Sequence, residues 1–283
     1  MHASAYHIVI RPTRTWFNLN LREIWRYRDL IYLFVRRDFV ARYKQTILGP
    51  LWSIMQPLMT TLIFTVIFSR VAKIPTDALP PVLFYQCGQL TWNYCANSFS
   101  ANSNTFVSNF HLFGKVYFPR MVVPISNLIS HLFAFTIELG TFLILYVHYK
   151  FILNTPGFGM DWRAIFLPVL VLQTAALSLG ISLITSASTA KYRDLTHAAG
   201  LLVSVWMYAT PVIYPLSSVP EKWRWVAAIN PMTAIVESCR LILLGSGTVA
   251  IEHLALSAIL TVILLAVGLI LFFRVEKTFI DTV

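Results

Sequence analysis

The few residues of this chain that could do chemistry form two small groups. Glu237 and Arg240 lie three positions apart, so on a helix they share one face and can form an ion pair. Asn127, His131 and Glu138 also recur at helical spacing, since residues 131 and 138 are separated by nearly two turns. Both groups lie in apolar sequence, where an ionisable side chain is a functional candidate. The alternative, which we favour for both, is a paired polar group that packs helices together.

Several patterns that would carry catalysis or nucleotide binding are absent from the sequence. No G-x-x-x-x-G-K-[ST] loop is present, because Gly114-Lys115 is followed by valine and lacks the earlier glycine. No histidine, cysteine or carboxylate group has zinc-ligand spacing, and neither H-E-x-x-H nor G-x-S-x-G occurs. The cysteines Cys87, Cys95 and Cys239 are interpreted as packing residues. The sequence therefore predicts no metal site, no catalytic centre and no phosphate-binding loop.

The composition of the chain explains why so few of its residues could catalyse a reaction or bind a ligand. The chain is 57% hydrophobic and 12% charged, with a mean hydropathy of +0.67, and its apolar residues form blocks of membrane-spanning length. We expect an all-α integral membrane protein. The net charge of +10 does not indicate nucleic acid, because nine of the 22 Lys and Arg residues precede residue 50 and flank the first apolar block. That bias is typical of a cytoplasmic N-terminus.

Six spans are expected within a single domain covering 1–283. They are placed at about 52–69, 82–101, 121–147, 164–188, 198–214 and 253–273. Residues 1–50 would form a cytoplasmic N-terminus, 52–273 the membrane region and 274–283 a cytoplasmic tail. With both termini inside, the inner segments hold 15 of the 22 Lys and Arg residues. The second span is rich in Gln and Asn, so it should face protein or a pore rather than lipid.

The segment 215–250 contains a further apolar stretch, at 226–244, that could be counted as a seventh span. Asn230-Pro231 breaks it near its start, and Glu237 and Arg240 fall inside it. We therefore expect two short helices that enter from the outer side and return. Such non-helical backbone is tolerated only where protein or water covers it.

The stretch 36–47 predicts a basic amphipathic helix. Phe39, Val40, Tyr43 and Ile47 fall on one face, and most of the charged residues fall on the other. A helix of this kind lies in the plane of the membrane interface. It is at least a cytoplasmic anchor, and it could also form a collar on which a partner protein docks.

Aromatic side chains are abundant near the predicted outer side. They could belong to the interfacial belt of a membrane protein, or they could line a pathway in which flat rings stack on sugar rings. The residues concerned are Tyr85, Trp92, Tyr94, Trp206, Tyr208, Tyr214, Trp223 and Trp225.

Four runs of sequence resemble one known family in order and spacing. RRDFVARYKQTILGPLW at the first span, KVYFPRMVVP (115–124), KYRDLTHA (191–198) and the long run from Tyr208 to Arg240 are similar to polysaccharide-exporting ABC permeases of the ABC-2 type. The chain resembles the membrane subunit of an O-antigen exporter, whose relatives export capsular polysaccharide and teichoic acid.

The resemblance implies partners that composition does not show. It implies a homodimer in the bacterial cytoplasmic membrane, with two copies of a separate ATPase that binds ATP and Mg. A lipid-linked glycan would enter from the inner leaflet into a channel with aromatic lining. This chain itself would hold no cofactor and would not be an enzyme.

The resemblance also assigns roles to segments. The loop 102–118 would hold the coupling helix that docks on the ATPase, and the amphipathic helix at 36–47 would be the interface helix. The segment 215–245 would form the outer gate, with Glu237 and Arg240 as its ion pair. Residues expected at the cytoplasmic interface are Arg37, Arg42, Lys44, Asn109, Phe113, Lys115, Lys191, Arg193 and Asp194.

Three other classes of protein remain as alternatives. A small-molecule efflux permease of the same superfamily should show less aromatic lining. A membrane acyl- or glycosyltransferase needs convergent acids or histidines at a membrane face, and only His131 and Glu138 come near this. An ATP-independent channel would transport without ATP.

Overall fold

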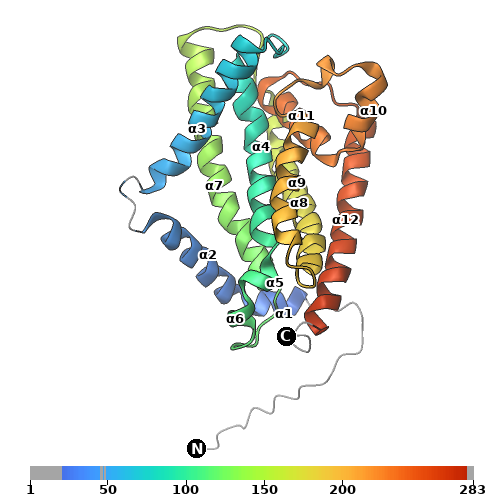
Figure 1. Ribbon diagram of the computed structural model, residues 1–283. Helices are drawn as coiled ribbons and strands as arrows, with labels where there is room; N and C mark the ends of the chain where they lie inside the picture. The colour runs from blue at the N-terminus through green and yellow to red at the C-terminus, as the bar shows by residue number, and fades with distance from the viewer. Residues whose placement is uncertain (1–20, 45–46, 48, 279–283) are drawn as a thin grey trace, which may run out of the picture.

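A computed structural model describes residues 21–44, 47 and 49–278, and within these ranges every regular element is helical. Figure 1 shows long helices standing side by side, with short helices gathered at the two ends. The long helices are α3 (Trp52–Phe64, continued by a π-helical stretch to Val71), α4 (Pro81–Asn102), α7 (Val122–Val147), α8 (Leu167–Thr189), α9 (Leu195–Ala209) and α12 (Ile251–Thr278).

The short helices mark the ends of the bundle. At the end where α12 finishes, Figure 1 shows α1, α5 and α6, and α10 and α11 lie at the opposite end. The bounds of these short helices are α1 Leu21–Arg26, α5 Thr105–Ser108, α6 Phe110–Phe113, α10 Glu221–Ile229 and α11 Pro231–Leu244, and the longer α2 spans Arg28–Tyr43. The helix α2 runs obliquely toward the start of α3 and packs against α7.

Four helical segments are long and apolar enough to cross a membrane: Trp52–Val71, Val122–Ile152, Trp162–Thr189 and Ile251–Lys277. They match the spans predicted at 52–69, 121–147, 164–188 and 253–273. The helix α4 has 22 residues but not the required hydropathy, and α9 is only 15 residues long. The all-helical, multi-pass prediction is therefore confirmed, while the count of six spans stays a prediction.

Local sequence explains where the helices begin and end. Pro81 starts α4 and Pro231 starts α11, each at a first-turn position where the missing proline N–H has no partner to lose. Gly245 ends α11 in the left-handed conformation, with φ 71°, which glycine adopts without a steric penalty.

The break predicted at Asn230-Pro231 is confirmed. The helix α10 ends at Ile229, α11 begins at Pro231, and their axes differ by 100°. The side-chain oxygen of Asn230 accepts the N–H of Met232, at 3.1 Å, and so caps the second helix.

Two expected helix boundaries are wrong. The helix placed at 36–47 is α2, which begins at Arg28 and ends at Tyr43, so Ile47 lies outside it. Phe34 and Val35, rather than the predicted apolar face, are its buried residues, because the chain before residue 36 is helical and Phe34 packs into a core cluster with Phe113 and Phe118. The fifth span, expected to reach residue 214, ends at Ala209, where Thr210 turns to extended backbone.

Helices α8 and α12 touch backbone to backbone. A Cβ placed on Gly180 would lie 2.6 Å from the amide nitrogen of Leu265, and one on Gly268 would meet the carbonyl of Gly180. Small residues at such crossings let transmembrane helices pack closely, which compensates for the weak hydrophobic drive between helices in lipid. The two helices therefore form one unit.

This contact predicts the effect of adding a single methyl group. Gly180→Ala should lower the free energy of unfolding by about 1–3 kcal/mol, because the helices must separate to admit it. Gly140→Ala in α7 is the matched control, since a Cβ there meets nothing within 4 Å. Melting temperatures of the two purified variants in detergent provide the measurement. Equal melting temperatures would show that the backbones are not in contact.

Candidate functional site

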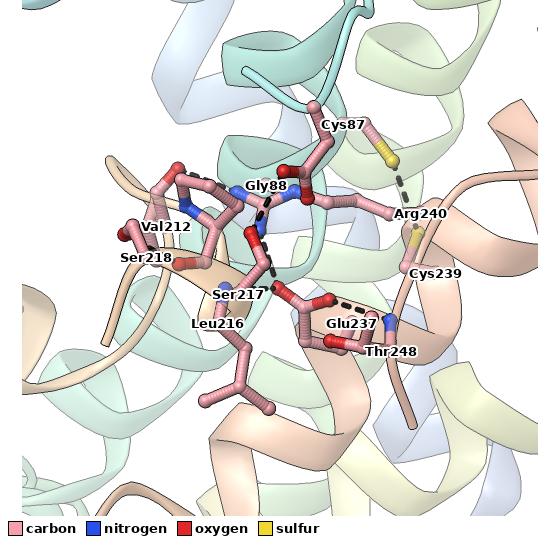
Figure 2. A network of polar contacts seen from close by, with 12 residues as sticks. Cys87, Gly88, Val212, Leu216, Ser217, Ser218, Glu237, Cys239, Arg240 and Thr248 are labelled. Atoms are coloured by element: carbon pink, nitrogen blue, oxygen red, sulfur yellow. Dashed lines mark hydrogen bonds and ion pairs between the residues drawn. The ribbon is translucent and has the colours of Figure 1, made fainter. Parts of the chain in front are cut away.

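The predicted pair of Glu237 and Arg240 is formed and fully enclosed. Arg240 Nη1 donates to Glu237 Oε1 at 2.8 Å, and the two side chains are 2% exposed or less. The other terminal nitrogen, Nη2, donates to the carbonyl of Val212 at 2.8 Å, and the guanidinium lies 3.8 Å from the centre of the Phe84 ring. Figure 2 shows this network where α4, α11 and the segment after α9 meet.

The carboxylate of Glu237 has further partners in the chain on either side. Its Oε1 accepts the N–H of Leu216 and its Oε2 accepts the N–H of Thr248, each at 3.3 Å. A buried carboxylate needs several donors to offset the loss of water. One ion pair thus holds the segments before α10 and after α11 against α11 itself (Figure 2). It lies at the end of the bundle where Figure 1 shows α10.

A glycine makes room for the guanidinium. A Cβ at Gly88 of α4 would lie 2.9 Å from the Val212 carbonyl oxygen and 3.0 Å from Arg240 Nη2. One residue earlier, the Sγ of Cys87 lies 3.8 Å from the Sγ of Cys239, and both thiols are free and buried. The cysteines are packing residues, as expected, although sequence spacing did not predict that these two meet.

Asn230 holds the corner between α10 and α11 against the end of α9. Besides capping α11, its Oδ1 accepts the indole N–H of Trp206 at 3.0 Å. Its Nδ2 donates to Thr210 Oγ1 at 2.9 Å and to the carbonyl of Ala209 at 3.3 Å. The amide uses all its hydrogen-bonding capacity to join three helices.

Polar residues of α4 pair with α7 at two levels along the bundle. Asn93 Nδ2 donates to Glu138 Oε1 at 2.8 Å, and Asn127 Nδ2 donates to Asn102 Oδ1 at 2.8 Å. Of the three polar residues predicted on one face of the third span, Asn127 and Glu138 therefore contact α4. His131 is not part of these pairs, and within the described residues its buried Nδ1 has no hydrogen-bond partner.

A third pair lies nearer the end that carries α10. Gln86 Nε2 donates to Thr141 Oγ1 at 3.2 Å, so three pairs of side chains are hydrogen-bonded between the two helices. The polar side chains of α4 were predicted to face protein or a pore, and in these pairs they contact protein. In lipid a polar group without a partner is costly, so such pairs hold helices together. We call these three pairs the α4–α7 polar ladder.

The predicted aromatic residues divide into enclosed and exposed sets. Tyr85, Trp92 and Tyr94 of α4 are at most 4% exposed within one chain, and Trp92 meets Trp206 edge-on at 5.5 Å. Tyr214 is partly buried, and its hydroxyl donates to the carbonyl of Tyr208 at 3.2 Å. Large exposed rings remain at Tyr208, Trp223 and Trp225, which are 55–62% exposed.

The α2 residues that were predicted to face the cytoplasm lie along the exposed side of the helix. Arg37 is partly engaged, because it pairs with Asp38 at 2.8 Å and lies over the ring of Phe34 at 4.8 Å. Arg42 borders a shallow recess between α2 and α7. Lys44 is exposed just after the end of the helix.

The residues predicted in the two loops lie at the same end of the bundle. Asn109 joins α5 to α6 and donates to the carbonyl of Thr105 at 3.0 Å, while Phe113 is buried. Lys115 is exposed. The turn between α8 and α9 exposes three further predicted residues, which are Lys191, Arg193 and Asp194.

Among the described residues, no cluster of three or more His, Cys, Asp or Glu side chains could hold a metal ion. A bundle of apolar helices joined by hydrogen bonds between buried polar side chains is typical of an integral membrane protein. The chain also matches a family model described as ABC-2 type transporter over residues 29–244. It therefore belongs to the ABC-2 type transporter family, whose members are multi-pass transmembrane subunits and not themselves catalysts.

Individual relatives extend this similarity over most of the chain. The O-antigen export system permease protein RfbA of Myxococcus xanthus is 30% identical over 247 residues, which cover 87% of this chain and 92% of the relative. A permease of the same name from Klebsiella pneumoniae is 27% identical over 253 residues, covering 89% and 94%. Membership of the family implies an ABC ATPase as partner.

The enclosed ion pair predicts a large loss of stability when one partner is removed. Arg240→Met should cost about 3–5 kcal/mol, because it leaves a buried carboxylate without its cation and the Val212 carbonyl without its donor. Adding Glu237→Gln should recover part of that loss. The fraction of permease that stays soluble in detergent after heating measures both effects. A double variant no more stable than Arg240→Met alone would contradict the pairing.

Proposed function

We propose that this chain is the transmembrane subunit of an ATP-driven transporter that exports a lipid-linked polysaccharide of the O-antigen type. The observation that carries the proposal is the match to O-antigen export permeases. The match covers almost nine-tenths of this chain and more than nine-tenths of each relative. Capsular polysaccharide and teichoic acid are the alternative cargoes, because the motifs do not separate these glycan classes.

The proposal assigns the energy source to a partner. The sequence has no phosphate-binding loop, so ATP and Mg are bound by two copies of a separate ABC ATPase. Their docking surface is the end of the bundle that carries α5, α6, the α8–α9 turn and the exposed cations of α2 (Figure 1). In this proposal that end faces the cytoplasm, both termini lie inside, and the membrane is the bacterial inner membrane.

In this proposal the glycan passes through a channel formed by a homodimer. One chain encloses its own polar groups, while α9 leaves Leu201, Leu202, Val205 and Tyr208 between 59% and 67% exposed. A second copy facing this surface would form a channel between the two chains rather than inside either one. The broken pair α10 and α11 would then stand at the outer mouth as a gate, held in place by Glu237 and Arg240.

Exposed aromatic rings at the outer end suit the proposed cargo. Trp223 and Trp225 of α10 are 55% and 61% exposed, so they are free to contact sugar rings. The C–H faces of a sugar stack on an indole without a tight, sequence-specific site. A polymer can therefore slide past such rings as it leaves the membrane.

The partner ATPase is tested by co-purification from the native membrane. Wild-type permease should bring down a P-loop ATPase in about equal amount, with vanadate-sensitive ATP hydrolysis. Permease that purifies alone in several detergents, without hydrolysis, would overturn the proposed function.

Charge reversal should locate the docking surface. Arg37→Glu combined with Arg42→Glu should reduce the ATPase recovered with the permease, because it replaces two cations at the proposed interface by anions. The matched control is Arg70→Glu with Arg163→Glu, two exposed cations at the opposite end of the bundle. Equal recovery of ATPase by both double variants would place the docking surface elsewhere.

Truncation of an exposed ring should slow export without unfolding the permease. Trp223→Ala should reduce polymer at the cell surface by about two- to tenfold, the range expected when one aromatic contact is lost. Lys222→Ala is the control, since it removes an exposed neighbour that is not aromatic. Trp92→Ala should instead lower stability, because that ring is buried against Trp206. Normal surface polymer in both Trp223→Ala and Trp225→Ala variants would overturn the aromatic pathway.

A further inference from the structure

Arg120 lies between α6 and α7 and joins three parts of the cytoplasmic end. It is only 6% exposed, although the loop around it is open to solvent at Val116 and Tyr117. Its backbone N–H donates to Glu276 Oε1 at 3.1 Å, and its Nη1 donates to the backbone carbonyl of Glu276 at 2.5 Å. Each side chain thus binds the main chain of the other residue.

This crossed contact joins two helix ends that need partners. The carbonyl of Glu276 is in the last turn of α12, where carbonyl groups lack intrahelical donors. The N–H of Arg120 lies just before α7, where amide groups lack acceptors. A cation at the C-terminal end of α12 and an anion at the N-terminal end of α7 also complement both helix dipoles. The start of α7 and the end of α12 are therefore held together by the two residues.

The same guanidinium rests on the proposed docking loop. Its central carbon lies 6.0 Å from the ring of Phe106 in α5 and 5.5 Å from the ring of Phe113 in α6. Phe106 in turn stacks on Phe272 of α12, with ring centres 4.7 Å apart. The loop residues thus reach α12 by two routes, through Arg120 and through Phe272.

We propose that Arg120 is the positioning residue that transmits movement of the α5–α6 loop to α12. The proposal rests on the proposed function, because it requires an ATPase that docks on this loop. A push on α5 and α6 moves the phenylalanine rings, the guanidinium on them and the helix end that the guanidinium holds. Since α12 is packed on α8 through Gly180 and Gly268, both helices respond together. No contact of Arg120 with ATP or glycan is needed.

The test compares three quantities for the complete permease–ATPase complex: ATPase recovered with the permease, ATP hydrolysed per complex in proteoliposomes, and polymer at the cell surface. For Arg120→Ala we expect ATPase recovery and hydrolysis within about twofold of wild type and export lower by about fivefold or more, as typical for loss of coupling between sites. Arg120→Lys should restore part of the export, because lysine keeps the positive charge and can still donate a hydrogen bond.

Two further variants separate the crossed contact from an ordinary ion pair. Glu276→Gln should export normally, since an amide oxygen still accepts the Arg120 N–H, whereas Glu276→Leu should resemble Arg120→Ala. Exchange of the two residues, Arg120→Glu with Glu276→Arg, should not restore export, because neither new side chain can make the bond to the main chain.

Three results would overturn the inference. One is normal export by Arg120→Ala. The second is a fall of all three quantities in the same proportion, which would mean that Arg120 only maintains the fold. The third is restored export in the exchanged pair. A wild-type permease that recovers no ATPase would overturn the proposed function and this inference with it, so the two failures are distinguishable. Arg22→Ala is the control for losing an exposed cation at the same end.

Discussion

The burial of one guanidinium constrains the upper half of the bundle. Arg240 is about 1% exposed, and every strong contact it makes is to a different segment: Glu237 on its own helix, the Val212 carbonyl before α10, and the Phe84 ring of α4. A charge in such surroundings is tolerated only when its partners are fixed. The close approach at Gly88, the 100° bend at Asn230 and the turn at Gly245 are the local geometries that bring those partners to it.

The same requirement shapes α4. Its Gln and Asn residues keep it below the hydropathy of a typical span, and three of them bond to α7 in the α4–α7 polar ladder. A helix that is polar on one side and buried on almost all sides can stand at the centre of the bundle without meeting lipid. The more apolar α3 and α12 occupy the periphery (Figure 1). The position of each helix, central or peripheral, thus follows from where its polar groups can form hydrogen bonds.

The sequence predicts those features that depend on residues close together in the chain. Three-residue spacing predicted the pairing of Glu237 with Arg240, and proline chemistry predicted the break before α11. It did not find Asn93 as the partner of Glu138, or Glu276 as the partner of Arg120, because contacts between distant helices leave no local pattern. The bounds of α2 were wrong for a related reason: its buried face is decided by the distant phenylalanines packed against Phe34. The roles of the aromatic and basic residues depend on partner chains that a single sequence does not specify.

The backbone contact of Gly180 with Gly268 has a consequence for how the protein is made. Helix α8 emerges from the ribosome before α9, α10, α11 and α12, so its glycine face enters the bilayer with no partner to cover it. Only when α12 is inserted can that face close, and until then the exposed peptide groups of Gly180 are opposite lipid or an assisting insertion factor. Insertion of α12 therefore completes the contact with α8, and it is the stage at which a larger side chain at either glycine would do most harm.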